Sequence, residues 1–434
     1  MHSFKFQNEY INSSHVDQVE IEKIAATVKT PFYVYSANQL KNHLTTLKNT
    51  LPDALNYFYS LKANPNLSLV RIIHQQGVGC EVCSLAELET ALAAGALPGE
   101  IIFVGPGKSA HELSRCVALG IKAVVVESLS ELALLNQLAA DAGVVQTFAF
   151  RINPNFTSEK ARLVMSGKPR QFGIDEHTVL ETLNHLDQYP HVALEGIHIY
   201  LGTRILDAEA VVVNTRNILS LAERIQRDYD ITLNFVDIGG GLGVPYYPKE
   251  TELDLDVVAA GMEPVIREFR YSFPQTKLIM ELGRFITGRS GMFVTRVRYL
   301  KESKGKMFVV CDGGSNCHGA AAGLGSVIRK NFPIARLGSG HDTGERQPYM
   351  LTGPLCTPTD LIGDDVQLPQ LDEGDLIGIF HSGAYGPTAS PVYFLSFGYP
   401  TEVLVDGDQV TVIRHADGVE HMLAQQQSQH ITVS

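Results

Sequence analysis

One lysine stands at the end of an apolar, aromatic run, Tyr57-Phe-Tyr-Ser-Leu-Lys-Ala-Asn-Pro65. The run has the composition of a buried strand, and its proline ends the strand pattern. A lysine in apolar surroundings loses proton affinity, and its neutral amine can condense with an aldehyde. Lys62 is therefore a candidate nucleophile. The alternative is an ordinary lysine that extends its ammonium group from the end of a strand into solvent.

A glycine-rich segment, Asp237-Ile-Gly-Gly-Gly-Leu-Gly243, follows another strand-like run. Glycines let backbone N–H groups approach a phosphate closely, and phosphate sites often follow the late strands of a barrel. Gly239, Gly240 and Gly241 are the candidates for such a site. The spacing is neither that of a P-loop nor that of a dinucleotide-binding fingerprint. A tight turn after a strand would use the same glycines for backbone reasons alone.

A third motif, Glu281-Leu-Gly-Arg284, closes a further apolar strand. A carboxylate held there can bind the protonated nitrogen of a heteroaromatic ring, and an arginine can hold a phosphate or carboxylate through two hydrogen bonds. The alternative is a salt bridge at the rim of the sheet.

Two turn-like segments later in the chain carry a thiol, a carboxylate and a phenol. Gly353-Pro-Leu-Cys-Thr-Pro-Thr-Asp360 contains Cys356, and His381-Ser-Gly-Ala-Tyr-Gly386 places Tyr385 between glycines. A lone cysteine or tyrosine commonly does no more than pack in a core. These residues therefore indicate a functional site only in combination with the motifs before them.

Composition and charge narrow the class of protein. The net charge of -12 argues against a nucleic acid or an anionic membrane as partner, because both attract positive surfaces. Cys80-Glu-Val-Cys83 could be a redox pair or half of a zinc site, but no second such pair or nearby histidine completes it. The first residues lack a signal-peptide pattern, and no run approaches 18 apolar residues. We expect a reduced, cytoplasmic enzyme without a metal.

From residue 31 to 285, short apolar runs alternate with amphipathic helical stretches. Regular alternation predicts a parallel sheet, and about eight such units favour a (β/α)8 barrel over an open, doubly wound sheet. Ser84, Glu87 and Gly95 predict the caps of one helix. The expected strands are 32–35, 55–59, 79–83, 101–104, 123–126, 147–152, 194–200, 234–238 and 277–281.

After residue 285 the pattern changes to strand-like runs separated by turn residues. This predicts a second, mainly β domain over 286–434. Residues 1–30 precede the first expected barrel strand, so we expect them to join the β domain.

The order of the motifs resembles that of the alanine-racemase-type decarboxylases, fold type III, which include the diaminopimelate and ornithine decarboxylases. YSLKANPN is similar to the lysine motif of that family, DIGGGLG to its glycine loop, ELGR to its EPGR, GPLCTPTD to its GPxCxxxD, and GAYG to its GAY. The resemblance covers nearly the whole chain. It implies a (β/α)8 barrel with a β domain, pyridoxal 5′-phosphate as cofactor, and a homodimer with active sites at the subunit interface.

The resemblance also implies roles for single residues. Lys62 would bind the cofactor aldehyde, and Glu281 would keep the ring nitrogen protonated. Cys356, from the partner subunit, would return a proton to the substrate after CO2 leaves. The phosphate and the rest of the cofactor would be held by Gly239, Gly240, Gly241, Gly283, Arg284 and Tyr385.

Three departures from the family pattern concern the substrate. His198-Ile-Tyr-Leu-Gly-Thr203 stands where diaminopimelate decarboxylases usually have HxHIGS, so Tyr200 would stack on the cofactor ring. Thr357 replaces the glutamate expected after the cysteine, which belongs to recognition of a distal amino group. An RPALY-like segment is missing after Asp312-Gly-Gly-Ser-Asn-Cys-His318. The candidates for substrate binding are Thr357, Asp360 and His318.

These departures resemble a subgroup that acts in antibiotic (butirosin-type) or siderophore assembly. We therefore expect α-decarboxylation of an L-amino acid or of an acylated or carrier-bound amino acid derivative in secondary metabolism. The alternatives are a diaminopimelate, ornithine or lysine decarboxylase, an amino acid racemase on the same barrel, and a non-catalytic homologue. A racemase would need a tyrosine base in the β domain, and a non-catalytic homologue would be expected to lose the lysine or cysteine motif.

Overall fold

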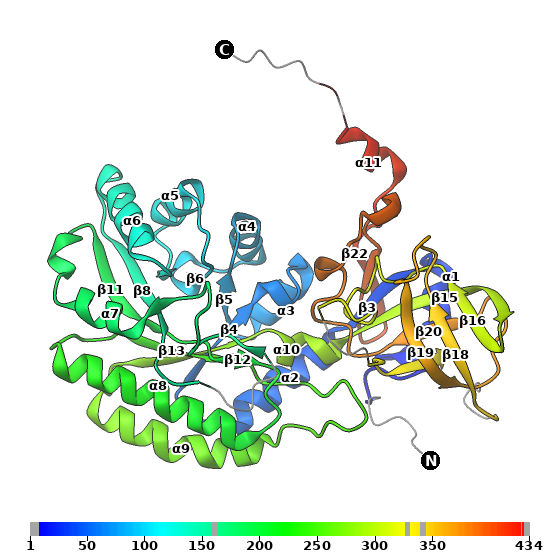
Figure 1. The fold of residues 1–434 in the computed structure, drawn as a ribbon, viewed down its shortest axis with the longest axis horizontal. Coiled ribbons are helices and arrows are strands. Elements are labelled where there is room, and N and C mark those ends of the chain that lie inside the picture. The colour runs from blue at the N-terminus through cyan, green and yellow to red at the C-terminus, as the bar shows by residue number, and fades with distance from the viewer. Residues whose placement is uncertain (1–7, 158–162, 326–329, 339–343, 427, 429–434) are drawn as a thin grey trace. The chain divides into compact units, whose positions relative to one another are not determined.

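A computed structural model describes residues 8–157, 163–325, 330–338, 344–426 and 428. The chain forms two compact units, which are described separately (Figure 1). The barrel unit comprises Lys41–Pro245 and Lys249–Ile286, and the β unit comprises Met1–Leu40, Tyr246–Pro248 and Thr287–Ser434. No helix among the described residues is long and apolar enough to cross a membrane.

In the described part of the barrel unit, eight parallel strands close into a ring, because the last strand pairs with the first. In ring order they are β4 (Leu55–Ser60), β5 (Gly79–Val82), β6 (Ile101–Phe103), β7 (Ala123–Val126), β8 (Gln146–Asn153), β11 (Val192–His198), β13 (Phe235–Gly240) and β14 (Lys277–Leu282). The short strand β10 (Ile174–Asp175) adds to β8. The predicted closed barrel is confirmed, and the open sheet is excluded.

Helices separate the barrel strands in the sequence and lie outside them, with α8 and α9 side by side (Figure 1). They are α2 (Ala37–Thr50), which begins in the β unit, α3 (Leu67–Gln75), α4 (Leu85–Ala94), α5 (Ala110–Leu119), α6 (Leu129–Asp141), α7 (Glu176–Leu183), α8 (Ala208–Asp228) and α9 (Leu255–Ser272). The cap residues of α4 behave as predicted: the Ser84 hydroxyl accepts the Glu87 N–H, and Gly95 ends the helix at φ 109°. The Glu87 carboxylate differs from the prediction, since it accepts the N–H of Cys83 rather than that of Ser84.

Apolar side chains fill the inside of the barrel. The buried cluster there takes residues from strands around the ring: Phe58, Ile102, Val104, Ala123, Val125, Ala149, Phe235 and Ile279. Strands that are covered on both faces have continuous apolar sequences. This pattern predicted the barrel strands. The packed interior leaves the strand ends to position polar groups.

The β unit is built on a mixed sheet of nine strands among its described residues. The main path runs β19 (Leu361–Leu368), β18 (Gln347–Thr352), β16 (Lys306–Cys311), β15 (Gly291–Ser303), β3 (Phe32–Ser36), β21 (Thr401–Asp406) and β22 (Gln409–Arg414), while β20 (Leu376–Ile379) pairs with β15 and with β17 (Ile334–Leu337). Helix α1 (Ile21–Thr27) contributes Ile21, Ile24 and Ala25 to the core of this unit. The mainly β character expected after residue 285 is confirmed.

The expectation that residues 32–35 form the first barrel strand is wrong. Strand β3 pairs antiparallel with β15 and parallel with β21, and all five of its residues are buried. A short, fully buried strand has the same apolar pattern inside a mixed sheet as inside a barrel, so the sequence alone could not separate the two. The barrel unit consequently begins at Lys41 rather than at residue 31.

Candidate active site

The side chain of Lys62 lies just beyond the carboxyl end of strand β4, in a single 3-10 turn, Leu61–Ala63. Its ammonium nitrogen is 3.4 Å from Oε1 of Glu81, which is fully buried at the end of β5. The same nitrogen lies 5.5 Å from the centre of the Tyr200 ring. Gly283 keeps this turn close to the end of β14, because a Cβ there would lie 2.8 Å from that of Ala63. The lysine is thus held between a carboxylate and an aromatic ring.

Two strand ends supply a buried histidine–carboxylate pair. His198 ends β11 and Glu281 lies near the end of β14, with Nε2 of the histidine 3.1 Å from Oε2 of the glutamate. Burial alone would raise the pKa of the Glu281 carboxyl. The charge and hydrogen bond of His198, helped by Lys62 and Arg151, outweigh burial and lower that pKa. Glu281 is therefore charged although it is 2 % exposed.

The glycine loop begins at the end of β13, beside this pair. Oδ1 of Asp237 accepts the N–H of Gly239 at 2.9 Å, and Gly239 has a φ of 65°. A side chain at Gly240 would collide with the carbonyl oxygen of Glu281, and one at Gly241 with that of Gly202. Close backbone packing therefore requires glycine here, whatever ligand the loop holds.

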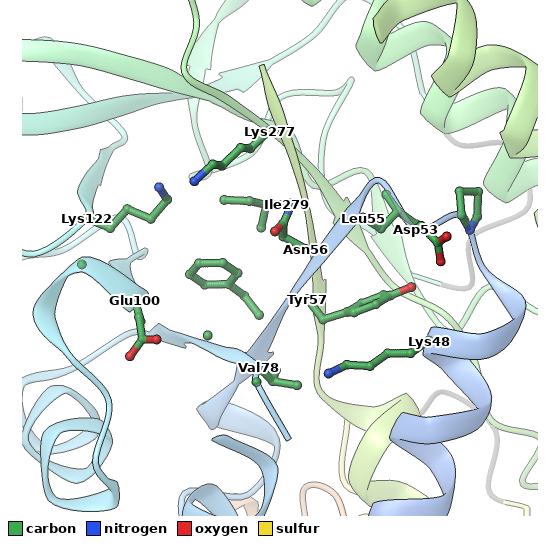
Figure 2. A pocket seen from close by; sticks show the side chains of 15 residues that line it. Lys48, Asp53, Leu55, Asn56, Tyr57, Val78, Glu100, Lys122, Lys277 and Ile279 are labelled. Atoms are coloured by element: carbon green, nitrogen blue, oxygen red, sulfur yellow. The ribbon is translucent and has the colours of Figure 1, made fainter. Parts of the chain in front are cut away.

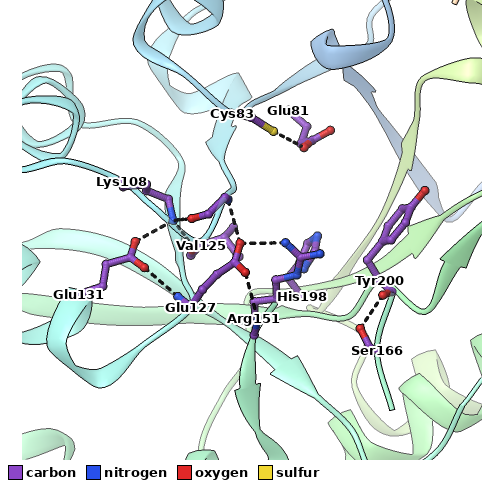
Figure 3. Close-up of polar contacts among 12 residues, drawn as sticks. Glu81, Cys83, Lys108, Val125, Glu127, Glu131, Arg151, Ser166, His198 and Tyr200 are labelled. Carbon is purple, nitrogen blue, oxygen red and sulfur yellow. Dashed lines mark hydrogen bonds and ion pairs between the residues drawn. The ribbon is translucent and has the colours of Figure 1, made fainter. Parts of the chain in front are cut away.

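A second set of charged side chains begins at Arg151, whose strand β8 pairs with the strand of His198 (Figure 3). Arg151 donates to Oε1 of Glu127 at 2.8 Å, and the other carboxylate oxygen accepts the N–H of Gly173. Lys108 binds Glu131 at 2.7 Å, and Glu131 accepts the N–H of Glu127. These bonds fix Arg151, whose positive charge acts on Glu281.

Several buried polar atoms at this end of the barrel have no hydrogen-bond partner among the described residues. They are Oε2 of Glu81, Nε of Arg151, Nδ1 of His198, Oδ2 of Asp237 and Oε1 of Glu281. Leaving a buried polar group unpaired costs about 1–3 kcal/mol, so such a cluster at one place indicates a ligand site.

The donor set fits pyridoxal 5′-phosphate. The cofactor needs an amine for its aldehyde, a carboxylate for its ring nitrogen, a surface for its ring and a cradle for its phosphate. Lys62, Glu281 and Tyr200 offer the first three, and the glycine loop with half-buried Arg284 offers the fourth. The structure brings together the residues that the sequence predicted for this site in the barrel unit.

Four residues of the site were not predicted: Glu81, Arg151, His198 and Asp237. Each is a charged or polar side chain in the second half of a barrel strand or at its middle, among mostly apolar residues. That position was the available signal, because active sites of closed barrels lie at the carboxyl ends of the strands.

The β unit holds the remaining predicted residues. Cys356 and Thr357 lie in a turn between β18 and β19, where Cys356 is exposed and the Thr357 hydroxyl lies 3.0 Å from that of Thr359. Asp360 is buried, and its two carboxylate oxygens accept the N–H groups of Ser315 at 2.6 Å and Leu355 at 2.7 Å. Both Asp360 oxygens thus hold the backbone, and its expected contact with the substrate gains no support from this geometry.

His318 lies in the core of the β unit rather than at its surface. It is completely buried, its Nε2 lies 2.9 Å from the Ser382 hydroxyl, and its Nδ1 accepts the N–H of Ala321 at 3.3 Å. Burial lowers the pKa of His318 to about 3. Both ring nitrogens are engaged, so the expected contact of His318 with the substrate also gains no support.

Tyr385 occupies a strained backbone position. It has a φ of 54°, and His381, four residues earlier, has a φ of 58°. Left-handed backbone at residues other than glycine is costly and is concentrated at functional sites. The strain is consistent with the phosphate-binding role predicted for Tyr385, which remains a prediction.

A separate cavity of about 510 Å³ opens at the amino-terminal ends of the barrel strands (Figure 2). Lys48, Lys122, Lys277 and Glu100 are among its lining residues. It contains none of the predicted site residues. In closed barrels this end usually serves stability rather than catalysis.

A closed (β/α)8 barrel with a lysine, a buried carboxylate and a glycine turn at its rim, in one chain with a β unit, defines the alanine-racemase-like class of pyridoxal enzymes. Residues 37–288 match the family described as pyridoxal-dependent decarboxylase, pyridoxal binding domain. The chain belongs to this family. It is a decarboxylase, and its cofactor is pyridoxal 5′-phosphate.

Individual relatives are similar to nearly the whole chain. The L-glutamyl-[BtrI acyl-carrier protein] decarboxylase of Niallia circulans is 36% identical over 95% of this chain and 97% of its own. The diaminopimelate decarboxylase of Archaeoglobus fulgidus is 33% identical over 95% of this chain and 96% of its own. The crystal structure of diaminopimelate decarboxylase from Helicobacter pylori with L-lysine has a TM-score of 0.84 at 29% identity, covering 93% of this chain and 98% of that chain.

Proposed function

We propose that this enzyme removes the α-carboxyl group of an L-amino acid derivative whose far end is acylated or attached to a carrier protein. The observation that carries the proposal is Thr357, an uncharged residue directly after Cys356. A free diamino acid presents an ammonium group at its far end, and burying that charge requires a nearby carboxylate. The relative from Niallia circulans, named for a carrier-bound glutamyl substrate, supports the same reading.

The residues of the barrel unit divide the binding of the cofactor among them. Lys62 would bind the aldehyde of the cofactor, Glu281 would keep the proton on its ring nitrogen, and Tyr200 would cover the ring. Gly239, Gly240 and Gly241 approach the phosphate with their backbone, and Arg284 adds a positive charge. When bound, the cofactor supplies an electron sink for the bond to the departing carboxyl group. Glu81 orients the lysine through the 3.4 Å contact.

Cys356 returns a proton to the substrate carbon after CO2 has left. We further propose that the enzyme is a homodimer in which Cys356 of one subunit serves the Lys62 site of its partner. The exposed position of the thiol in the single chain supports this arrangement. Tyr385 keeps the phosphate-binding role that the sequence predicts for it.

Mixing two inactive variants tests the shared site. If Lys62→Ala and Cys356→Ala chains form random dimers, half of the dimers are mixed and one of the two sites in each is intact. Activity should then return to about one quarter of the wild-type level. Mixed dimers demonstrated by differential tagging, but without activity, would exclude shared sites.

Release of CO2 from a panel of substrates tests the reaction itself. The panel contains a glutamyl thioester on a carrier protein, an N-acylated diamino acid, free glutamate, meso-diaminopimelate, ornithine and lysine. We expect the extended substrates to be at least about 10²-fold better by kcat/KM than the free amino acids. A preference for meso-diaminopimelate would instead support the second candidate, a diaminopimelate decarboxylase, which the 33% identity to the Archaeoglobus fulgidus enzyme favours. Formation of the D-amino acid without CO2 would identify a racemase.

A further inference from the structure

Asp237 is a buried acid of the barrel unit, and it is not among the residues proposed to contact the cofactor or the substrate. Its side chain has no exposed surface, and it lies within β13, two residues before the first glycine of the loop. Its Oδ1 accepts the N–H of Gly239 and thereby fixes the first turn of the glycine loop. Its other oxygen, Oδ2, has no hydrogen-bond partner among the described residues.

Asp237 stands close to a second carboxylate. One polar atom of each of His198, Asp237 and Glu281 lies within 4.8 Å of the other two, and all three residues are buried. Two carboxylates so close together in a buried place repel each other strongly when both are charged. One of the two acids is therefore expected to carry a proton.

The surroundings decide which acid keeps its charge. Glu281 has the 3.1 Å contact with His198 and also feels the positive charges of Lys62 and Arg151. Asp237 has one backbone N–H, and burial together with the negative charges of Glu281 and Glu81 raises its pKa well above the usual range. The proton therefore belongs to Asp237.

We propose that Asp237 is a positioning residue that acts as a neutral acid: it fixes the Gly239 turn through one oxygen and leaves Glu281 as the single negative charge of the pair. Oδ1 accepts a hydrogen bond and is therefore the carbonyl oxygen, so Oδ2 carries the proton. In this way Asp237 links the glycine loop to the carboxylate for the ring nitrogen. The inference rests on the cofactor contacts proposed for Glu281 and the loop.

A comparison of the variants Asp237→Asn and Asp237→Ala tests whether Asp237 is a neutral acid or a charged carboxylate. Asparagine keeps an oxygen for the Gly239 N–H and places an N–H donor where the acid has its O–H. We expect the Kd for pyridoxal phosphate, measured without substrate, to stay within about threefold of wild type in Asp237→Asn and to rise at least about tenfold in Asp237→Ala. Equal losses in the two variants would overturn the proposal.

Infrared difference spectroscopy provides a readout that does not depend on cofactor binding. The spectrum of wild type minus Asp237→Asn should contain the carbonyl band of a protonated carboxylic acid at neutral pH. A difference spectrum with only carboxylate bands would overturn the proposal even if Asp237→Ala did not fold. Both measurements omit substrate, so their failure is distinct from failure of the substrate assignment.

Asp360→Asn is the matched control. This buried acid accepts a backbone N–H with each oxygen, so an amide would turn an N–H donor toward another donor. We expect Asp360→Asn to lower the melting temperature and to show no loss of a protonated-acid band. If Asp360→Asn and Asp237→Asn were equally well tolerated, the contrast on which the assignment of the proton rests would fail.

Discussion

Asp237 of the barrel unit and Asp360 of the β unit are both buried acids close to a strand end, yet their surroundings differ. Each oxygen of Asp360 accepts a backbone N–H, and both nitrogens of the buried His318 are likewise engaged. In the barrel, Asp237, Glu281, His198 and Glu81 each keep one polar atom without a partner among the described residues. Buried groups that the protein satisfies maintain structure, whereas buried groups left unsatisfied indicate where a ligand completes the bonding.

The largest effect that tests this contrast is expected from Lys62→Ala. The variant loses the amine for the cofactor aldehyde, and kcat should fall by roughly 10³-fold or more. Borohydride treatment, which attaches the cofactor to wild-type protein, should leave the variant unlabelled. Because Lys62 serves a ligand rather than the fold, the melting temperature of the cofactor-free protein should hardly change. A folded variant that still fixes the label would show that another residue is the nucleophile.

Asp360→Ala is expected to have the opposite profile. Removing the carboxylate leaves the N–H groups of Ser315 and Leu355 buried without a partner. The expected loss of stability is about 2–4 kcal/mol, measured by denaturant unfolding. Borohydride labelling of Lys62 should continue in the fraction that remains folded. Unchanged stability would break the contrast between the two units.

Cys356→Ala tests an exposed residue of the β unit only four positions before the buried Asp360. We expect normal cofactor absorbance, normal stability and a fall in kcat of about 10²-fold, as for loss of a general acid. Mass spectrometry of the products should also show transamination from protonation at the wrong carbon. Cys317→Ala, a buried thiol in the same unit, is the control and should affect stability more than product fidelity. Wild-type turnover in Cys356→Ala would remove its assigned role.

Much of the fold was accessible from the sequence, because strand and helix patterns in a barrel are local. The prediction for β3 was wrong because a buried strand of five residues has the same sequence pattern in the barrel as in the β unit. Only its pairing with β15 and β21 shows that it belongs to the β unit. The lysine, glycine-loop and Glu281 motifs were recognisable from their joint order. Asp237 stands in the sequence as the first residue of the glycine loop, and its proximity to Glu281 depends on the pairing of β13 with β14.

The sequence alone does not predict which single polar side chains are buried. His318 and Asp360 stand in polar, turn-like segments that suggested contact with a substrate, but the fold surrounds both with hydrogen-bonding groups of the protein. Conversely, Glu81 and His198 stand in barrel strands, and each keeps one polar atom without a partner among the described residues. Whether a polar group is satisfied depends on residues far away in the sequence, so only the three-dimensional structure separates the two kinds of residue.

The smallest expected effect concerns the pH dependence of stability in the β unit. Burial lowers the pKa of His318 to about 3, so the folded protein keeps this ring neutral while the unfolded chain binds a proton below about pH 6.5. Stability is therefore full above that pH and falls as the pH drops toward 3, by up to about 1.4 kcal/mol per pH unit. His318→Gln should lack this part of the acid sensitivity, about 2 kcal/mol between pH 7 and pH 5, in denaturant unfolding. His177→Gln, at an exposed position, is the control and should follow wild type. Parallel pH profiles for wild type and His318→Gln would mean that the buried ring is not held neutral in the folded protein.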